Sequence, residues 1–222
     1  MGLAAAAGPA GARSPVVVEL FTSQGCASCV KAGELIADFG ARPRVIALTF
    51  DVDYWDYLGW QDTFAKSEFA DRQRAYLKPL GVHDVYTPEV VVNGRRETPA
   101  VDPQAVDKLV QDAQHDAQDP PQIIVRKKTL AVGAAPAPKG GGEVWLVRYD
   151  PREQSVAVKK GETRGAVMVE RNIVHELIRL GAWRGRPRTF RLPAAEDASL
   201  AAVVLVQGAH GGPHPPGIDL QG

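Results

Sequence analysis

The two cysteines of the chain, Cys26 and Cys29, constrain the fold more than any other feature. They follow the apolar run Val16 to Phe21, which has the length of a buried strand, and they open a helical pattern that ends near Gly40. Unpaired backbone N–H groups at a helix N-terminus stabilise a thiolate and lower the pKa of the first cysteine. The pattern therefore predicts Cys26 as a nucleophile and Cys29 as the thiol that resolves a mixed disulfide.

Other interpretations of the cysteine pair stay open. A zinc site needs two further ligands, and the five histidines form no doublet at ligand spacing. Two thiolates can bind a soft metal such as Cu(I), although Met1 and Met168 form no cluster that would support copper. An inert structural disulfide in an exported protein is a further alternative. We predict no resident metal and no cofactor.

The composition and the net charge exclude some classes of binding partner. The 26 basic and 26 acidic residues cancel, and a nucleic-acid binder normally carries a surplus of positive charge. No apolar run approaches the ~20 residues that a membrane-spanning helix needs. We therefore expect a protein or small-molecule thiol or disulfide as substrate, with no nucleic-acid partner and no membrane span. The sequence specifies no oligomeric state.

The chain divides at the Asp119-Pro120-Pro121 break into two predicted domains. Residues 14–118 follow the order βαβαββα, with the Asn93-Gly94 turn between two strands and a final helix opened by Asp102-Pro103. Residues 119–222 are predicted as a β-rich, antiparallel, sandwich-like domain with one strand over 122–132 and a mobile loop at 134–142. Helix and strand patterns fit residues 167–180 about equally.

The Ala- and Gly-rich residues 1–13 are predicted to be a disordered tail or the remnant of an export signal. A signal remnant would suit an exported protein.

Thr87-Pro88 precedes the apolar run Val90 to Val92 and the Asn-Gly turn, after a strand and two helices. At this point the chain resembles the thioredoxin superfamily, in which a cis-proline lies beside the Cys-x-x-Cys pair. The resemblance implies that Thr87 and Pro88 position a substrate chain. Gly25 would let that chain approach closely.

The chain also resembles, over most of its length, a secreted thioredoxin-like bacterial family catalogued as domain of unknown function number 1223. The family implies a β-rich C-terminal part and a periplasmic location. It usually has proline after the second cysteine and histidine before the Val-Asp-Tyr-Trp segment, where this chain has Val30 and Asp51. The resemblance is carried by these motifs: Glu19-Leu20-Phe21-Thr22-Ser23-Gln24-Gly25-Cys26, Asp53-Tyr54-Trp55-Asp56, Leu58-Gly59-Trp60, Arg72-Gln73-Arg74-Ala75-Tyr76, Tyr86-Thr87-Pro88, Val92-Asn93-Gly94, Gly161-Glu162 and Leu180-Gly181-Ala182-Trp183.

An acidic, aromatic segment follows the second predicted strand and contains Asp51, Asp53, Trp55 and Asp56. One interpretation is a solvated loop held by aromatics in the core. The other is a lip over the cysteines, with a carboxylate that relays a proton during disulfide exchange. The sequence as a whole favours an exported thiol:disulfide oxidoreductase; the alternatives are a non-catalytic binding module with a structural disulfide and a copper-handling protein.

Overall fold

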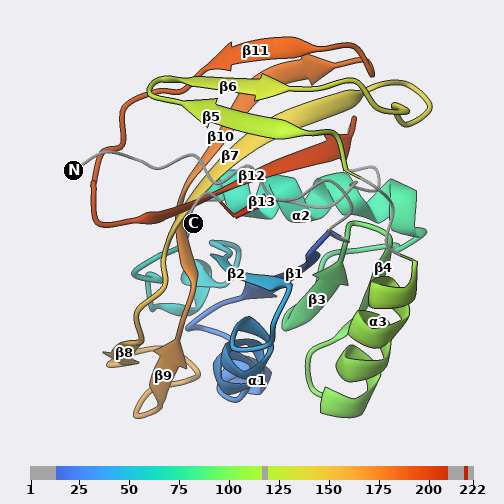
Figure 1. Ribbon diagram of the computed structural model, residues 1–222. Coiled ribbons are helices and arrows are strands. Elements are labelled where there is room, and N and C mark those ends of the chain that lie inside the picture. Colours follow the sequence, from blue (N-terminus) through green and yellow to red (C-terminus); the bar gives the residue numbers. More distant parts are fainter. Residues whose placement is uncertain (1–13, 117–119, 210–217, 220–222) are drawn as a thin grey trace.

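The computed structural model describes residues 14–116, 120–209 and 218–219. The predicted tail or signal remnant, residues 1–13, lies outside the described residues. The molecule is mixed α/β, with a large, mostly antiparallel β-rich portion and few helices (Figure 1).

The N-terminal half has the predicted order βαβαββα. Its elements are β1 (Val16–Thr22), α1 (Ala32–Gly40), β2 (Val45–Asp51), α2 (Ser67–Leu80), β3 (Glu89–Val92), β4 (Arg96–Pro99) and α3 (Pro103–His115), with short 3-10 turns η1 (Ala27–Cys29) and η2 (Asp56–Leu58).

The start of α3 has a side-chain cap, and a turn bonded to a side chain precedes α2. The Asp102 carboxylate accepts the backbone N–H groups of Gln104 and Ala105, which confirms the predicted N-cap before Pro103. The helix predicted from about residue 62 begins later, at Ser67. Before Ser67, the Asp62 carboxylate accepts the N–H groups of Phe64 and Ala65 and so holds residues 62–65 in a turn.

One eight-stranded sheet runs through the whole molecule, in the order β13-β12-β7-β10-β2-β1-β3-β4 (Figure 1). Strand β1 pairs parallel with β2 and antiparallel with β3, and β4 pairs antiparallel with β3. Strand β10 joins the edge of β2 in parallel, with Ile173 opposite Thr49. The sheet is thus continuous across the predicted boundary at residue 119. Its C-terminal strands are β7 (Gly142–Asp150), β10 (Ile173–Trp183), β12 (Ala201–Gly208) and β13 (Ile218–Asp219).

A second, three-stranded antiparallel sheet covers the C-terminal strands. It consists of β5 (Ile123–Arg126), β6 (Thr129–Val132) and β11 (Arg188–Arg191). The prediction of a single strand over 122–132 was wrong, because the chain reverses at Lys127, whose φ of 50° belongs to a tight turn. The predicted loop at 134–142 connects β6 to β7.

Residues 167–180 form strands and not a helix. Strand β9 (Val167–Glu170) pairs with β8 (Gln154–Ala157) as a separate two-stranded hairpin, and β10 then begins at Ile173. Between them Asn172 has a φ of 55°, a conformation that interrupts a helix and redirects the chain. The apolar spacing that fits a helix face comes from two strands that bury different faces.

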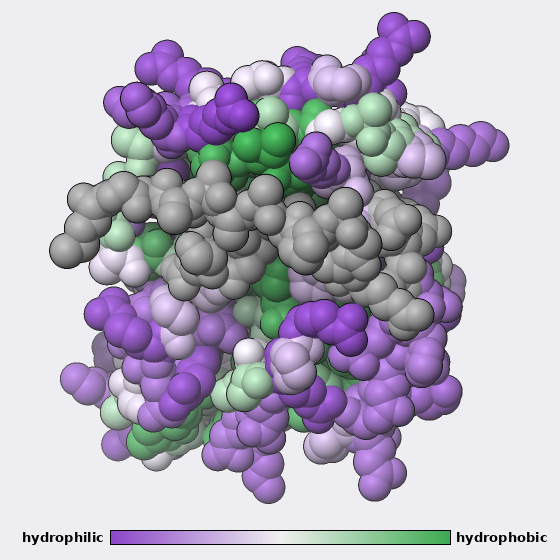
Figure 2. All heavy atoms as spheres, in the orientation of Figure 1, coloured by the Kyte–Doolittle hydropathy of each residue, from purple (hydrophilic) through white to green (hydrophobic). Residues whose placement is uncertain are grey.

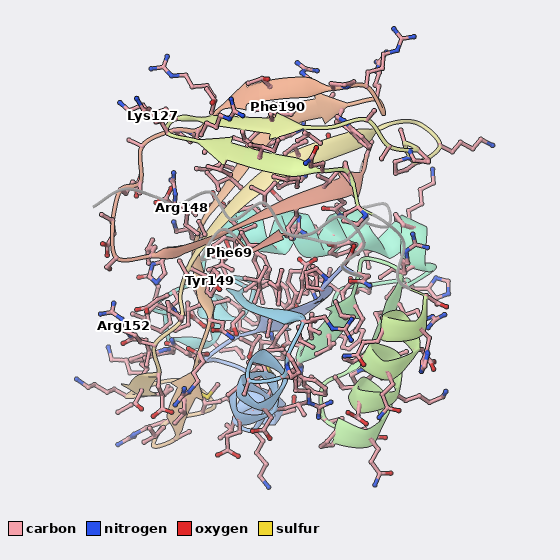
Figure 3. The ribbon with its side chains drawn as sticks, viewed as in Figure 1. Phe69, Lys127, Arg148, Tyr149, Arg152 and Phe190 are labelled. Carbon is pink, nitrogen blue, oxygen red and sulfur yellow. A yellow bond between two sulfur atoms is a disulfide. The ribbon has the colours of Figure 1, made fainter. Side chains whose placement is uncertain are left out.

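Each face of the large sheet has its own hydrophobic core. Helices α1 and α3 cover one face, and α2 lies on the other (Figure 1). The α2 core joins side chains of both halves of the chain; Phe69 of α2 and Tyr149 of β7 belong to it and lie close together in Figure 3. Figure 2 shows hydrophilic side chains over much of the visible face around α1 and α3.

Candidate redox site

Cys26 and Cys29 form a disulfide with an S–S distance of 2.11 Å. Strand β1 leads into the loop Ser23 to Gly25, and both cysteines then lie in the turn of η1, where the Cys29 N–H donates to the Cys26 carbonyl at 3.0 Å. The α-helix begins only at Ala32. The expectation that the cysteines open a continuous helix is therefore corrected: they lie in a 3-10 turn directly before it.

The disulfide is almost completely covered. Cys26 is 1% exposed and Cys29 is 0% exposed, although Ser28 between them is at the surface. Five apolar side chains pack on the two sulfur-bearing residues: Val30, Trp55, Trp60, Val158 and Met168. The last two belong to the hairpin of β8 and β9, which is more than 120 residues away in sequence.

The segment at Thr87-Pro88 lies beside the cysteine turn, as predicted. The peptide bond between these residues is cis. Ser28 Oγ lies 3.3 Å from Cys26 Sγ and donates to the Thr87 carbonyl at 3.5 Å. Trp55 Nε1 donates to Thr87 Oγ1 at 2.8 Å. The structure thus brings together Cys26, Thr87 and Trp55, and Trp55 forms one wall of the site.

The close approach that Gly25 permits in this structure is that of Trp55, and the approach of a substrate chain stays a prediction. A Cβ atom at Gly25 would lie 3.0 Å from Trp55 Cβ, closer than carbon atoms normally come. The Gly25 N–H donates to Ser23 Oγ at 3.1 Å. Glycine at this position lets Trp55 reach Thr87.

The loop before the cysteines is held by buried polar contacts that the sequence did not reveal. The Asp62 carboxylate accepts the Gln24 N–H at 2.7 Å, and the Gln24 side-chain oxygen accepts Trp60 Nε1 at 3.0 Å. The Gln24 carbonyl accepts the hydroxyl of Thr163, in the tip of the β8–β9 hairpin, at 2.6 Å. Gln24 therefore connects the cysteine turn to two covering segments.

The predicted acidic segment separates into buried and partly exposed groups. Asp51, at the end of β2, is fully buried, whereas Asp53 and Asp56 are half-buried. One Asp56 oxygen accepts the Asp62 N–H at 3.1 Å, so Asp56 has a structural contact. Asp51 is therefore the only one of these three carboxylates that is fully buried.

Asp51 faces a second buried carboxyl group, that of Glu170 on β9. The two side chains are within hydrogen-bonding reach of each other, and the side chain of Gln24 also lies near Glu170. Burial raises the pKa of Asp51 well above its usual value, and the charge of Glu170 adds to the effect. Burial and the charge of Asp62 raise the pKa of Glu170 to about 7. Such a pair holds one proton between its two groups near neutral pH.

Strand β9, which carries Glu170, lies against the first turn of α1, just after the cysteine turn. Met168, which packs on the disulfide, and Glu170 project from the same face of β9. A Cβ at Gly33, four residues after Cys29, would lie 1.9 Å from the Val169 carbonyl oxygen. Only glycine permits this approach of helix and strand.

Two further expectations concern metal ions and membranes. Within residues 14–116, 120–209 and 218–219, no three His, Cys, Asp or Glu side chains are grouped so that they could hold a metal ion. Over the same residues, no helix has the length and apolar character needed to cross a membrane.

The comparisons with known proteins show a family and a fold. The profile of the family described as "Protein of unknown function (DUF1223)" matches residues 17–207. A crystal structure of a protein from Agrobacterium tumefaciens is 32% identical, with a TM-score of 0.74, and the match covers 95% of each chain. HBP35 of Porphyromonas gingivalis has a TM-score of 0.60 at 12% identity, covers 93% of this chain and 74% of its own, and is similar in fold alone. Among curated proteins there is no match.

Proposed function

The chain belongs to the DUF1223 family, and from the geometry of its own site we propose that it is an exported, periplasmic thiol:disulfide oxidoreductase with a thioredoxin-like N-terminal domain. The observation that carries the proposal is the Cys26–Cys29 disulfide in the turn between β1 and α1, with Thr87 beside it. A protein or small-molecule thiol is the expected substrate.

The strand arrangement supports the thioredoxin-like assignment. The elements of the predicted order βαβαββα form a sheet in the order β2-β1-β3-β4, with β1 parallel to β2 and antiparallel to β3. The cis Thr87-Pro88 bond directly before β3 matches the position that the resemblance implied.

The proposed reaction begins from the disulfide. A substrate thiolate attacks Cys26 Sγ, the Cys26–Cys29 bond breaks, and Cys29 leaves as a thiolate. A second substrate thiolate then attacks the substrate sulfur of the mixed disulfide, and Cys26 leaves as a thiolate. Two electrons pass from the substrate dithiol to the cysteine pair, and the two substrate protons balance the two new thiols. The reverse steps oxidise the protein and reduce a substrate disulfide.

The Asp51–Glu170 pair supplies a place for one of these protons within the protein. The pair holds a proton near neutral pH and lies in the region of Cys29, through the contacts of β9 with α1 and with the disulfide. A carboxyl group with a pKa near 7 can donate or accept a proton without a large free-energy cost. A role for Asp53 and Asp56 in the proton relay stays a prediction.

The burial of the disulfide favours a second candidate function. A pair that is 0–1% exposed is expected of a structural crosslink, in which case the protein is a non-catalytic binding module. The copper alternative requires the reduced thiols, because a disulfide offers no thiolate ligand.

Replacement of the resolving cysteine tests the proposal. Cys29→Ser leaves Cys26 as a free thiol that cannot be released from a mixed disulfide by its neighbour, so we expect covalent adducts through Cys26 in periplasmic extracts. The matched Cys26→Ser variant has the other thiol and should form few adducts. Non-reducing gels with mass spectrometry measure both. Complete absence of Cys26 adducts would favour the structural disulfide.

A further inference from the structure

The hairpin of β8 and β9 covers the sulfur atom that a substrate must reach. Attack on Cys26 requires a thiolate to approach Cys26 Sγ, and Cys26 is 1% exposed. Val158 from the hairpin tip (residues 158–166) and Met168 from β9 belong to the same buried cluster as the two cysteines. If the disulfide exchanges with a substrate, part of this cover must therefore move.

The tip of the hairpin is held to the rest of the cover mainly by packing, which includes the close approach of Gly161 to Trp60. Strands β8 and β9 form a sheet of their own, without ladder pairing to either larger sheet. One side-chain hydrogen bond, from Thr163 Oγ1 to the Gln24 carbonyl, joins the tip to the cysteine loop among the contacts of the described residues. The other wall is fixed more firmly, since Trp55 donates to Thr87 and Trp60 donates to Gln24.

The surface beneath Val158 is apolar, whereas Thr163 lies against the Gln24 carbonyl. When Val158 leaves, Met168 stays because the base of β9 is pressed against Gly33 of α1, and Trp55 and Trp60 stay with their hydrogen bonds. The opened site then presents a sulfur atom between a methionine and two tryptophan side chains. An aliphatic side chain can replace Val158 there without leaving a polar group unpaired.

We propose that the tip of the β8–β9 hairpin occupies the place of the substrate. On this proposal, which rests on the proposed function, the partner is an extended polypeptide whose cysteine is flanked by aliphatic residues. One of those residues replaces Val158 against Met168, Trp55 and Trp60, while the cysteine meets Cys26. The hairpin selects substrates because a polar residue beside the cysteine would lose its hydration in this apolar site.

The kinetics of two short synthetic peptides test the proposal. Each peptide contains one cysteine, flanked by valine in the first and by asparagine in the second, and each rate is normalised to the peptide's own rate with glutathione disulfide. We expect mixed-disulfide formation with Cys26 to be at least tenfold faster for the valine peptide, since an apolar site separates substrates that differ by a single methylene by roughly 10–200-fold and burial of an unpaired amide costs more. Equal rates, a faster asparagine peptide, or no reaction with either peptide would overturn the proposal.

Variants of the tip test whether the hairpin is the part that moves. Thr163→Val removes the hydroxyl that holds the tip to Gln24 and preserves the side-chain shape, whereas Thr163→Ser keeps a hydroxyl. Thr163→Val should accelerate both peptides roughly two- to tenfold, the ratio expected from one ordinary hydrogen bond. Thr163→Ser should stay near the wild-type rate.

A second pair of variants covers the case in which Thr163→Val does not fold. Val158→Ala weakens the packing of the tip on the cysteines and should also accelerate both peptides, whereas Ser155→Ala changes an exposed residue of β8 and should not. Unchanged rates in the folded variants would overturn the proposal. A wild-type disulfide that glutathione also cannot reduce would instead contradict the proposed function itself.

Discussion

At the scale of single residues, the most unusual feature is the buried carboxyl pair of Asp51 and Glu170. Both groups have a pKa above its ordinary value because burial disfavours the charged form. The folded protein therefore binds more protons than the unfolded chain at pH values between the unfolded pKa, about 4, and the folded pKa of Glu170, about 7. The free energy of unfolding must fall as the pH rises through this interval.

Glu170→Gln tests this linkage. The neutral amide keeps the shape of Glu170 and can donate to Asp51, so the fall in stability between pH 5 and pH 8 should become smaller. We expect the variant to be more stable than the wild type at pH 8 by about 3 kcal/mol, the linkage free energy of a carboxyl group whose pKa rises from 4.5 to about 7 on folding. Urea unfolding of the disulfide-intact protein at several pH values measures it. Glu34→Gln on the exposed face of α1 is the control, and an unchanged pH slope in Glu170→Gln would contradict the assignment.

The sequence predicted the local part of this site and missed the distant part. Cys26, Cys29, Thr87 and Pro88 belong to motifs whose neighbours in sequence signal the strand, turn and helix around them. Glu170 and Thr163 gave no such signal, because each acts on a residue more than 100 positions away and neither stands in a recognisable pattern.

At the scale of elements, the contact of α1 with β9 decides how the hairpin sits on the cysteine turn. A Cβ atom at Gly33 would clash with the backbone of β9, which cannot rotate away as a side chain can. A Cβ at Gly40, at the other end of the same helix, would come too close only to the side-chain amide of Asn172, which can rotate, and would lie at an ordinary contact distance from Ala47. The two glycines therefore differ in what a methyl group would displace.

Gly33→Ala should separate α1 from β9 and Gly40→Ala should not. Alanine in a helix normally stabilises by about 0.5–1 kcal/mol relative to glycine. We expect that gain, or no change, at Gly40 and a loss of about 1–3 kcal/mol at Gly33, the usual cost of overpacking. Urea unfolding gives the stabilities, and the rate at which glutathione reduces the disulfide should rise only for Gly33→Ala. Equal behaviour of the two variants would show that β9 does not press on the helix.

The elements also show where hydrophobic periodicity in the sequence does not predict the secondary structure. Residues 122–132 contain one apolar run but two strands, because the turn at Lys127 uses a left-handed lysine in place of a glycine or asparagine. Residues 167–180 fit a helix face, yet β9 and β10 bury their side chains against different parts of the molecule. Short apolar runs do not distinguish these cases without knowledge of the partner strand.

At the scale of the whole molecule, the two halves of the chain share one sheet and one core. Strand β10 pairs with β2 at Thr49, and the backbone N–H of Thr49 donates to the Asn172 carbonyl at 2.9 Å. A buried polar network crosses between the halves as well: Arg72 of α2 pairs with Glu19 of β1 and donates to the side chain of Gln207 in β12. The predicted boundary at residue 119 therefore separates segments of sequence that are packed together.

A truncated chain tests whether residues 14–118 fold alone. Removal of the C-terminal half exposes the edge of β2 and takes six buried side chains from the α2 core, namely Val147, Tyr149, Val174, Ala201, Val203 and Leu205. We expect residues 14–118 to lack a cooperative unfolding transition by circular dichroism. Residues 14–209, which keep all these strands, should unfold cooperatively. A cooperative transition in the shorter chain would confirm an independent domain.

The redox titration of the native protein tests the central claim most directly. Purified protein is equilibrated across a series of reduced-to-oxidised glutathione ratios, and the thiols are trapped and counted by mass spectrometry without denaturant during equilibration. The proposed function predicts that Cys26 and Cys29 open and close reversibly, with a potential well above about −300 mV. A pair that stays oxidised at every ratio, and opens only when the protein is denatured, would contradict it and leave the disulfide as a structural crosslink.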